Sequence, residues 1–226
     1  KANSGRFNIE DAGINSEFSD YGTSFSGNQL VFASARDTGG VAKKVFKWTN
    51  QSFTNLYSSV VKSDGKLEEP KRFGNRINSK FHESTPVFTK DGSTMYFTRN
   101  NFLEGKKGKD SKRITLLKIY KATLIDGQWK DVTELPFNSD QYSVAHPALS
   151  NDDKTLYFAS DMPGTFGQSD LFKVTINDDG TYSIPENLGT KINTEGRETF
   201  PFISDESELY FATDGRPGLG GLDIYV

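Results

Sequence analysis

The sequence of 226 residues has no cysteine. Disulfides, thiolate zinc sites and thiol nucleophiles are therefore excluded. No apolar run approaches the roughly 18 residues that a membrane-spanning helix needs. The residues after Lys1 lack the charged and apolar regions of a signal peptide, so we expect a mature or excised piece. An excess of positive charge is missing too, since 30 acidic and 27 basic residues give a net charge of −3. A dedicated nucleic-acid binder is therefore disfavoured.

Residues typical of strands and turns are abundant instead. The chain has 21 glycines, 8 prolines, 18 phenylalanines and 9 tyrosines. This composition favours strands joined by tight turns over a helical bundle.

A repeat runs through the chain. Each clear copy has a proline, a turn signal and a Tyr-Phe pair, and these copies span residues 86–97, 147–158 and 201–211, after a degenerate first copy at 23–32. An Asn-Ser or Asn-Thr pair precedes every copy, with spacings of 63, 60 and 55 residues. The asparagines of these pairs are Asn15, Asn78, Asn138 and Asn193.

Each copy is predicted to form one four-stranded antiparallel sheet. In the second copy, Asp91-Gly92 is a hairpin signal between two strands, and residues 170–174 and 128–135 are typical of a third and a fourth strand in their copies. One such sheet cannot bury both faces alone, so radial packing of the copies predicts an all-β fold, a β-propeller. The predicted blades within a single domain 1–226 are approximately 15–77, 78–137, 138–192 and 193–226.

The two ends of the repeat leave the number of blades open. Residues 6–14 occupy the place of a fourth strand, whereas the last copy ends on a third strand. Residues 6–14 either complete the last blade and close a four-bladed ring, or the four repeats are part of a larger propeller.

Two aspartates enclose a glycine-rich connection in each of the last two copies. One interpretation is a calcium site, because oxygen ligands on a flexible loop suit that ion. We favour a structural role in which the carboxylates accept hydrogen bonds from turn N–H groups, because each loop has few carboxylates. The predicted structural turn residues are Asp161, Asp170, Asp214 and Asp223.

Other polar residues precede the predicted innermost strands, whose starts should converge at one mouth of the propeller channel. Convergent polar groups at a concave mouth are the usual candidate for a binding site. The alternative is that the acids satisfy backbone donors of neighbouring blades. The predicted partner-binding residues are His82, Glu83, His146, Arg197 and Glu198.

Motifs for catalysis or metal binding are not found. Two histidines without a third nitrogen or sulfur ligand make a poor zinc site, and the sequence has no nucleophile elbow and no phosphate-binding loop. We therefore predict no catalytic residue, no metal and no cofactor. Paired carboxylates for glycoside hydrolysis stay an alternative, because Asp20, Glu83 and Glu198 would lie at the channel mouth.

The repeat resembles the TolB-type, WD-like β-propeller repeat. The resemblance rests on Pro-x-[Phe/Leu/Ile]-[Ser/Thr]-x-Asp-Gly, on the Tyr-Phe pair and on Gly-x-x-Asp-[Leu/Ile]-[Phe/Tyr], and it covers about residues 20–226. The loop that begins at Ser160-Asp161 and the Gly-Gly-Leu-Asp-Ile-Tyr segment look like the propeller of OmpA-family outer-membrane lipoproteins, which include a type IX secretion component. The first copy departs from the pattern, since it lacks the proline and Asp-Gly, and no OmpA-like segment is present.

This resemblance implies a periplasmic, non-catalytic scaffold associated with the outer membrane. It would bind an envelope protein partner through the propeller channel mouth or face, and reach peptidoglycan only through parts absent from this chain. We therefore expect a protein that is not an enzyme, binds no nucleic acid and has no direct membrane span. The alternative is a propeller for glycan- or peptidoglycan-related binding, or a glycosidase-like one.

Overall fold

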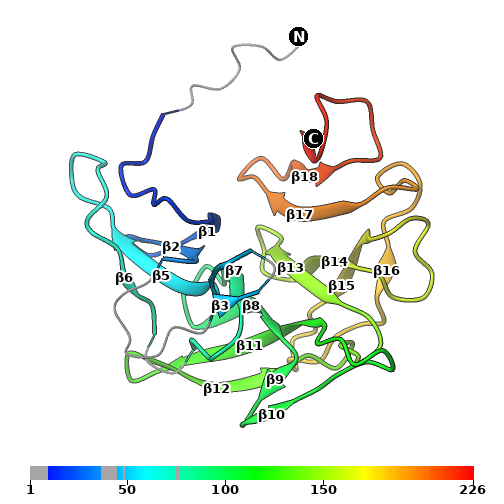
Figure 1. The fold of residues 1–226 in the computed structure, drawn as a ribbon, viewed down its shortest axis with the longest axis horizontal. Coiled ribbons are helices and arrows are strands. Elements are labelled where there is room, and N and C mark those ends of the chain that lie inside the picture. The colour runs from blue at the N-terminus through cyan, green and yellow to red at the C-terminus, as the bar shows by residue number, and fades with distance from the viewer. Residues whose placement is uncertain (1–9, 37–44, 48, 75–76) are drawn as a thin grey trace.

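The computed structural model describes residues 10–36, 45–47, 49–74 and 77–226 as an all-β fold. Four antiparallel sheets are arranged in a ring around a central axis, each with its first strand innermost (Figure 1). The predicted β-propeller with four blades is therefore confirmed. No helix among the described residues is long and apolar enough to cross a membrane.

The first three blades have four strands each. In each of these blades the strands follow one another in chain order from the axis outward. The first blade contains β1 (Asp20–Ser26), β2 (Gln29–Ser34), β5 (Asn55–Val60) and β6 (Lys71–Arg72). The second contains β7 (Glu83–Phe88), β8 (Thr94–Asn100), β11 (Leu117–Ile125) and β12 (Gln128–Glu134). The third contains β13 (Val144–Leu149), β14 (Thr155–Ser160), β15 (Asp170–Thr175) and β16 (Glu186–Asn187).

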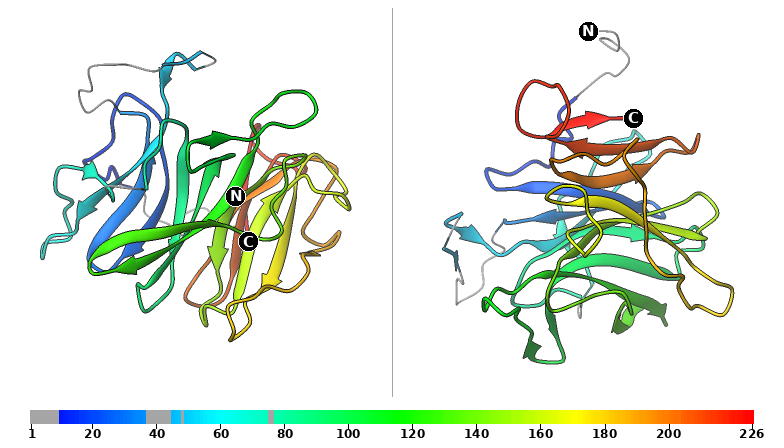
Figure 2. Two further views of the ribbon diagram at one scale, coloured as in Figure 1. Left: turned by 90° about the horizontal axis from the view of Figure 1, so that it is seen from below. Right: turned by 90° about the vertical axis from the view of Figure 1, so that its right-hand side faces the viewer.

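The fourth blade has three strands among the described residues: β17 (Glu198–Ile203), β18 (Leu209–Thr213) and β19 (Asp223–Tyr225). Of the predicted fourth strand at 6–14, residues 6–9 lie outside the described part, and residues 10–14 form no strand. Two short hairpins complete the fold, β3 (Val45–Phe46) with β4 (Gln51–Ser52) and β9 (Phe102–Leu103) with β10 (Lys106–Lys107). The second and fourth blades lie on opposite sides of the ring (Figure 2).

The core lies between the blades, because each sheet is apolar on both faces. Alternation along β8 sends Phe97 into the cluster shared with the first blade and Tyr96 into the cluster shared with the third. A smaller cluster around Leu171 and Phe211 joins the third and fourth blades. Face-to-face burial of apolar sheets is thus what holds the ring together.

The repeated asparagines also join consecutive blades. Asn193 accepts a hydrogen bond from the backbone N–H of Leu171 (2.8 Å) and donates one to its carbonyl oxygen (3.0 Å). Asn138 bonds Ile119 in the same way (3.1 and 2.7 Å), and Asn78 bonds Leu56 (2.7 and 3.0 Å). Each side chain therefore imitates a neighbouring strand, and we call this contact the asparagine clasp. The sequence showed the repeat of these residues but not their role.

Candidate functional site

Glu83, predicted at the channel mouth, lies inside the second blade instead. Its side chain is fully buried, accepts a hydrogen bond from Arg99 Nε (3.0 Å) and a second from the backbone N–H of Ser79 (3.0 Å). Burial raises the pKa of Glu83 to about 7, against the opposing effect of the Arg99 charge. An enclosed carboxylate of this kind offers no surface to a partner.

Glu198 has the equivalent place in the fourth blade and is also fully buried. Its carboxylate accepts hydrogen bonds from the backbone N–H and the hydroxyl of Thr194 (2.8 and 2.6 Å) and from the hydroxyl of Thr213 (2.6 Å). The expectation that these two acids form an exposed charged rim is thus corrected. The chain turns just before each inner strand, and the backbone N–H four residues before the acid has no partner in that strand. The carboxylate accepts a hydrogen bond from this N–H, which belongs to Ser79 in the second blade and to Thr194 in the fourth.

The other three predicted residues do not converge with them. His82 Nδ1 accepts a hydrogen bond from the backbone N–H of Thr54 (3.1 Å), and burial lowers its pKa. Arg197 is half-exposed and pairs with Asp214 (2.7 Å). His146 alone among the five lines the channel. That these residues bind a partner stays a prediction.

The aspartates of the glycine-rich loops bind backbone N–H groups. Asp170 accepts from Phe166 (2.8 Å) and Gly167 (3.3 Å), and Asp223 accepts at the equivalent positions of its own loop, Leu219 (3.0 Å) and Gly220 (3.4 Å). Asp161 accepts from the N–H of Ser143 (2.6 Å) and Asp214 from that of Arg197 (2.7 Å). Within the described ranges no three His, Asp or Glu side chains are grouped as metal ligands.

The innermost strands share a feature that the sequence analysis did not identify. Each has a β-bulge, where the register with the second strand shifts by one residue. The first residue of every bulge has a positive φ, and in three of the four blades a proline follows it. Proline fits here because the bulge needs no ladder N–H. The four bulge residues are Gly22 (φ 64°), Thr85 (44°), His146 (57°) and Phe200 (49°).

A positive φ costs energy for any residue other than glycine, and bulky or β-branched side chains are genuine outliers there. Thr85, His146 and Phe200 therefore hold strained backbone of about 1–3 kcal/mol each. Strain of this kind gathers at binding and catalytic sites, because the surrounding structure must impose it. The bulges turn these three side chains toward the channel.

His146 lies at the centre of this group. Its ring packs against that of Phe200, with 3.9 Å between the centroids and 31° between the ring planes. Its backbone N–H donates to Thr98 Oγ1 (2.8 Å), the Thr98 and Thr85 hydroxyls are 2.8 Å apart, and Thr85 Oγ1 is 3.4 Å from His146 Nδ1. Burial lowers the pKa of His146 to about 4, so the ring is neutral at pH 7.

These hydrogen bonds join His146 to two threonines. Thr98 Oγ1 accepts from the backbone N–H of His146, and the Thr85 hydroxyl lies between Thr98 Oγ1 and His146 Nδ1. Either hydroxyl can be the donor of the threonine pair, and Nδ1 accepts or donates according to the tautomer of the ring. The other ring nitrogen, Nε2, has no hydrogen-bond partner among the described residues and can bond to a ligand in the channel.

A cavity of about 500 Å³ opens beside these residues along the channel. The side chains around it are aromatic, aliphatic or hydroxyl-bearing, and no charged residue is among those that line it in the described part of the chain. Phe25 on β1 and Phe202 on β17 are 65% and 59% exposed. Strands β1 and β17 approach each other through the edge-on rings of Tyr21 and Phe200, 6.3 Å apart.

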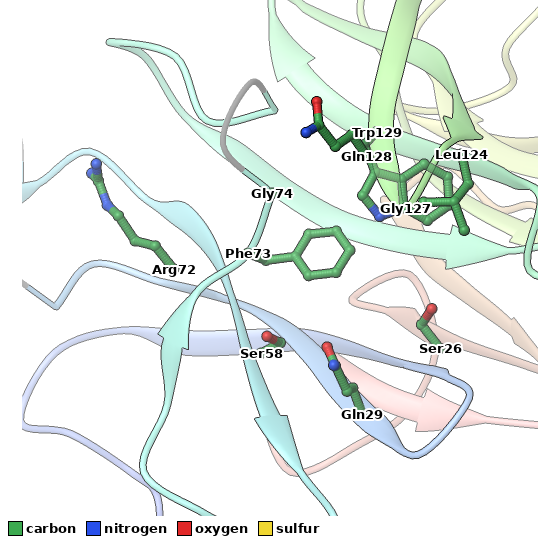
Figure 3. A pocket seen from close by; sticks show the side chains of 10 residues that line it. All are labelled: Ser26, Gln29, Ser58, Arg72, Phe73, Gly74, Leu124, Gly127, Gln128 and Trp129. Atoms are coloured by element: carbon green, nitrogen blue, oxygen red, sulfur yellow. The ribbon is translucent and has the colours of Figure 1, made fainter.

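A second cleft of about 380 Å³ lies between the first and second blades. Figure 3 shows the rings of Phe73 and Trp129 facing each other, whereas Arg72 points away from them. Both rings are buried, at 7% and 8% exposure, and pack with Phe88 in the core. This cleft is therefore mainly the margin of a packed interface, and the channel cavity with its strained residues is the stronger candidate.

A signal for the channel residues was present in the sequence. A proline inside a predicted strand marks a bulge, and Pro86, Pro147 and Pro201 stand at equivalent places. The residue before each proline is therefore the one that the bulge turns aside. No charge or motif distinguishes these residues, which is why a search for polar groups found only His146.

Comparison with known proteins supports the fold and shows no family. No family model and no curated protein matches this sequence. A thermostable family-43 glycoside hydrolase superimposes with a TM-score of 0.51 at 11% identity, over 88% of this chain and 66% of that one. A puromycin-hydrolysing peptidase from Mycobacterium tuberculosis gives 0.50 at 14% identity, over 93% and 30%. The chain thus spans less than two thirds of either structure, and the likeness shows the fold alone.

These comparisons correct one prediction and leave others untested. The prediction that the protein is not an enzyme is contradicted. Both of these solved structures are hydrolases that superimpose on this propeller, so a propeller fold does not exclude catalysis. They give no support for the resemblance to the TolB-type repeat or to the OmpA family. A periplasmic location and an envelope partner stay predictions.

Proposed function

We propose that this propeller binds a neutral carbohydrate in its channel cavity. The single observation that carries the proposal is the lining of the cavity, which combines aromatic rings and hydroxyl groups without a charged residue. A sugar ring has an apolar face of C–H groups and a rim of hydroxyls, and it needs both kinds of contact. A cavity of about 500 Å³ falls in the size range of small-molecule sites.

The strained residues have distinct roles in this proposal. Phe200, 37% exposed, offers a ring face to the C–H side of the sugar. His146 offers Nε2 to a sugar hydroxyl, which can either accept from or donate to this nitrogen. The contact of the imidazole with the Phe200 ring keeps it in place. The hydroxyls of Ser24 and Thr23 on β1 add groups that both donate and accept.

The proposal concerns recognition of the sugar. Hydrolysis of a glycoside generally requires two carboxyl groups that flank the scissile bond, and no Asp or Glu is among the described residues that line the cavity. Whether the bound sugar is also cleaved is measured separately in the experiment below.

A protein partner is a second candidate function, favoured by the exposure of Phe25 and Phe202 on the two strands that border the cavity. Large exposed aromatic residues that lie close together are typical of interaction surfaces. In this case an apolar segment of an envelope protein would enter the channel, as the periplasmic prediction suggests.

The test is a panel of neutral oligosaccharides measured by isothermal titration calorimetry. We expect Phe200→Ala to weaken binding at least about tenfold, the equivalent of about 1.4 kcal/mol. Phe166→Ala should leave binding unchanged, because Phe166 is a more exposed loop phenylalanine (52% against 37%) outside the cavity. Chromatography of the same samples reports any cleavage. Absence of binding by every neutral glycan would overturn the proposal, and binding of apolar peptides that depends on Phe25 would favour the second candidate.

A further inference from the structure

The second copy of the repeat differs from the other copies in charge at one position. The residue two places after the asparagine of each Asn-Ser or Asn-Thr pair is acidic in three copies, where it is Glu17, Asp140 and Glu195. In the second copy it is Lys80, which is exposed. Because three copies fold with an acid at this place, the fold does not require the lysine.

A second difference is the connection from β8 to β11 in the same blade. It spans residues 101–116 and contains the β9–β10 hairpin, and it is longer than the equivalent connections 161–169 and 214–222 of the next two blades. Residues 106–113 carry five cations and one acid, Asp110. The carboxylate of this acid accepts hydrogen bonds from two backbone N–H groups of its own turn (2.9 and 2.6 Å). None of the five cations forms an ion pair with a carboxylate of the described residues.

The two differences meet in space, because Lys80 and the hairpin share a pair of aromatic rings. Lys80 Nζ lies 5.0 Å from the ring centroid of Phe102 and 5.8 Å from that of Phe81. Lys107 Nζ lies 4.9 Å from the centroid of Phe81. The two ring centroids are 5.0 Å apart, and their planes are inclined at 59°. We call these four residues the lysine–phenylalanine cluster.

The backbone holds both rings of the cluster in place. The N–H of Phe81 donates to Ser79 Oγ (3.1 Å), and the N–H of Phe102 donates to the hydroxyl of Tyr120 (3.3 Å). Phe53 contacts Phe81 edge-on, with 6.0 Å between the centroids. The cluster is therefore formed before any partner binds, which lowers the entropy cost of binding.

The charges of the cluster are not compensated within the described part of the chain. Lys80 and Lys107 are exposed, and no ion pair joins either of them to a carboxylate there. Their ammonium groups lie near the same ring, so the two like charges repel each other. A negatively charged group bound between them would remove this repulsion. A local excess of positive charge on a chain of net charge −3 also attracts a negatively charged partner to this place.

We propose that the lysine–phenylalanine cluster and the basic residues of the adjoining loop bind an acidic protein segment that also carries aromatic side chains. Carboxylates of the segment pair with the ammonium groups, and its aromatic side chains pack on the partly exposed rings of Phe81 and Phe102. This binding is independent of the carbohydrate proposal, since none of the four residues lines the channel cavity.

The geometry of the rings favours a protein segment over single-stranded nucleic acid. Successive bases stack on open faces of aromatic rings. In the cluster the two rings are inclined to each other, and both are approached by the ammonium group of a lysine. They therefore provide an apolar floor between cations and not a stacking platform for bases.

The test measures the fluorescence anisotropy of a labelled peptide, Asp-Glu-Phe-Glu-Asp-Phe-Glu-Asp, added to the intact protein. Lys80→Glu gives the second copy the acid that the other copies have, so its urea denaturation should match that of the wild type. We expect this variant to bind the peptide at least about tenfold more weakly, because a like charge replaces the paired one. Lys90→Glu is the matched control, since this exposed lysine follows the opposite end of β7. The control makes the same change in net charge, and we expect it to alter binding less than about twofold.

Changes in the probe test the two kinds of contact separately. A peptide with serine in place of both phenylalanines should bind about threefold more weakly or worse, because it loses the contact with the rings. A peptide with the corresponding amides in place of its acids should not bind. A thymidine oligonucleotide and vesicles that contain phosphatidylserine are measured in parallel. Tighter binding of either than of the acidic peptide, equal losses in Lys80→Glu and Lys90→Glu, or undiminished binding of the amide peptide would overturn the proposal.

Discussion

Two sets of equivalent positions in this propeller behave in opposite ways. At the clasp, where blades are joined, Asn78, Asn138 and Asn193 make the same two bonds in each case. At the bulge, where the inner strands face the channel, every blade has a different residue, and three of them are strained. The contact that repeats holds the third strand of each four-stranded blade to the segment that leads into the next blade. What differs, at a cost in strain, lies where a ligand would be bound.

The largest effect is expected at the clasp. Asn193→Ala removes the bonds to Leu171 and Asn187 and leaves the backbone N–H and carbonyl of a buried residue without the side-chain partner. We expect a loss of roughly 4 kcal/mol in the free energy of unfolding, measured by urea denaturation. Asn15→Ala is the matched control, because this asparagine belongs to the same repeat but is exposed and bonds only Asp11 among the described residues. Similar losses in the two variants would contradict a structural role specific to the clasp.

Glu83 extends the comparison to the blade interior. Its pKa is about 7 in the folded protein and about 4.5 when unfolded, so the folded state binds more protons between these values. The contribution of Glu83 to the free energy of unfolding should therefore be complete below about pH 4.5 and decrease as pH rises through about 7, by up to about 3 kcal/mol. Glu83→Gln should remove this decrease in denaturation curves recorded from pH 4.5 to 8. If the variant keeps the slope, another group is responsible for it.

The titration of His146 should change the free energy of unfolding with pH in the opposite direction. Its pKa is about 4 in the folded protein against 6.5 when unfolded, so the unfolded state binds more protons and stability is lost as pH falls from about 6.5 toward 4. We expect about 2 kcal/mol, less than the shift alone implies, because the ring borders a cavity that water can enter. His146→Asn is the informative variant, since asparagine tolerates a positive φ and does not titrate. Its stability should vary less with pH across this range, and an unchanged slope would exclude His146 as the cause.

The sequence was sufficient for the fold and insufficient for the site, for reasons that particular residues show. Each blade is encoded by a local pattern of strands and turns that repeats along the chain, with a proline at the equivalent place in Pro86, Pro147 and Pro201. Such a pattern can be recognised without knowledge of contacts between distant residues. The side-chain direction of Glu83 is decided by Arg99, a residue of the neighbouring strand, and burial cannot be read from residue type alone. Phe200 was missed because an apolar residue in a strand is ordinarily core, and only the bulge turns it to the channel.

The smallest effect on stability is expected at the bulge, where Phe200→Gly separates binding from folding. Glycine relieves the positive φ of 49° by about 1 kcal/mol, while loss of a partly exposed ring packed against His146 costs about 1–2 kcal/mol. These terms oppose each other, so urea denaturation should show a net change within about 1 kcal/mol, yet binding of the neutral glycan should be lost. A loss of several kcal/mol would mean that the ring supports the blade as the asparagine clasp does. If the variant keeps both its stability and its binding of the glycan, then neither folding nor binding depends on Phe200. In that case the strained backbone at this position would have no role in either.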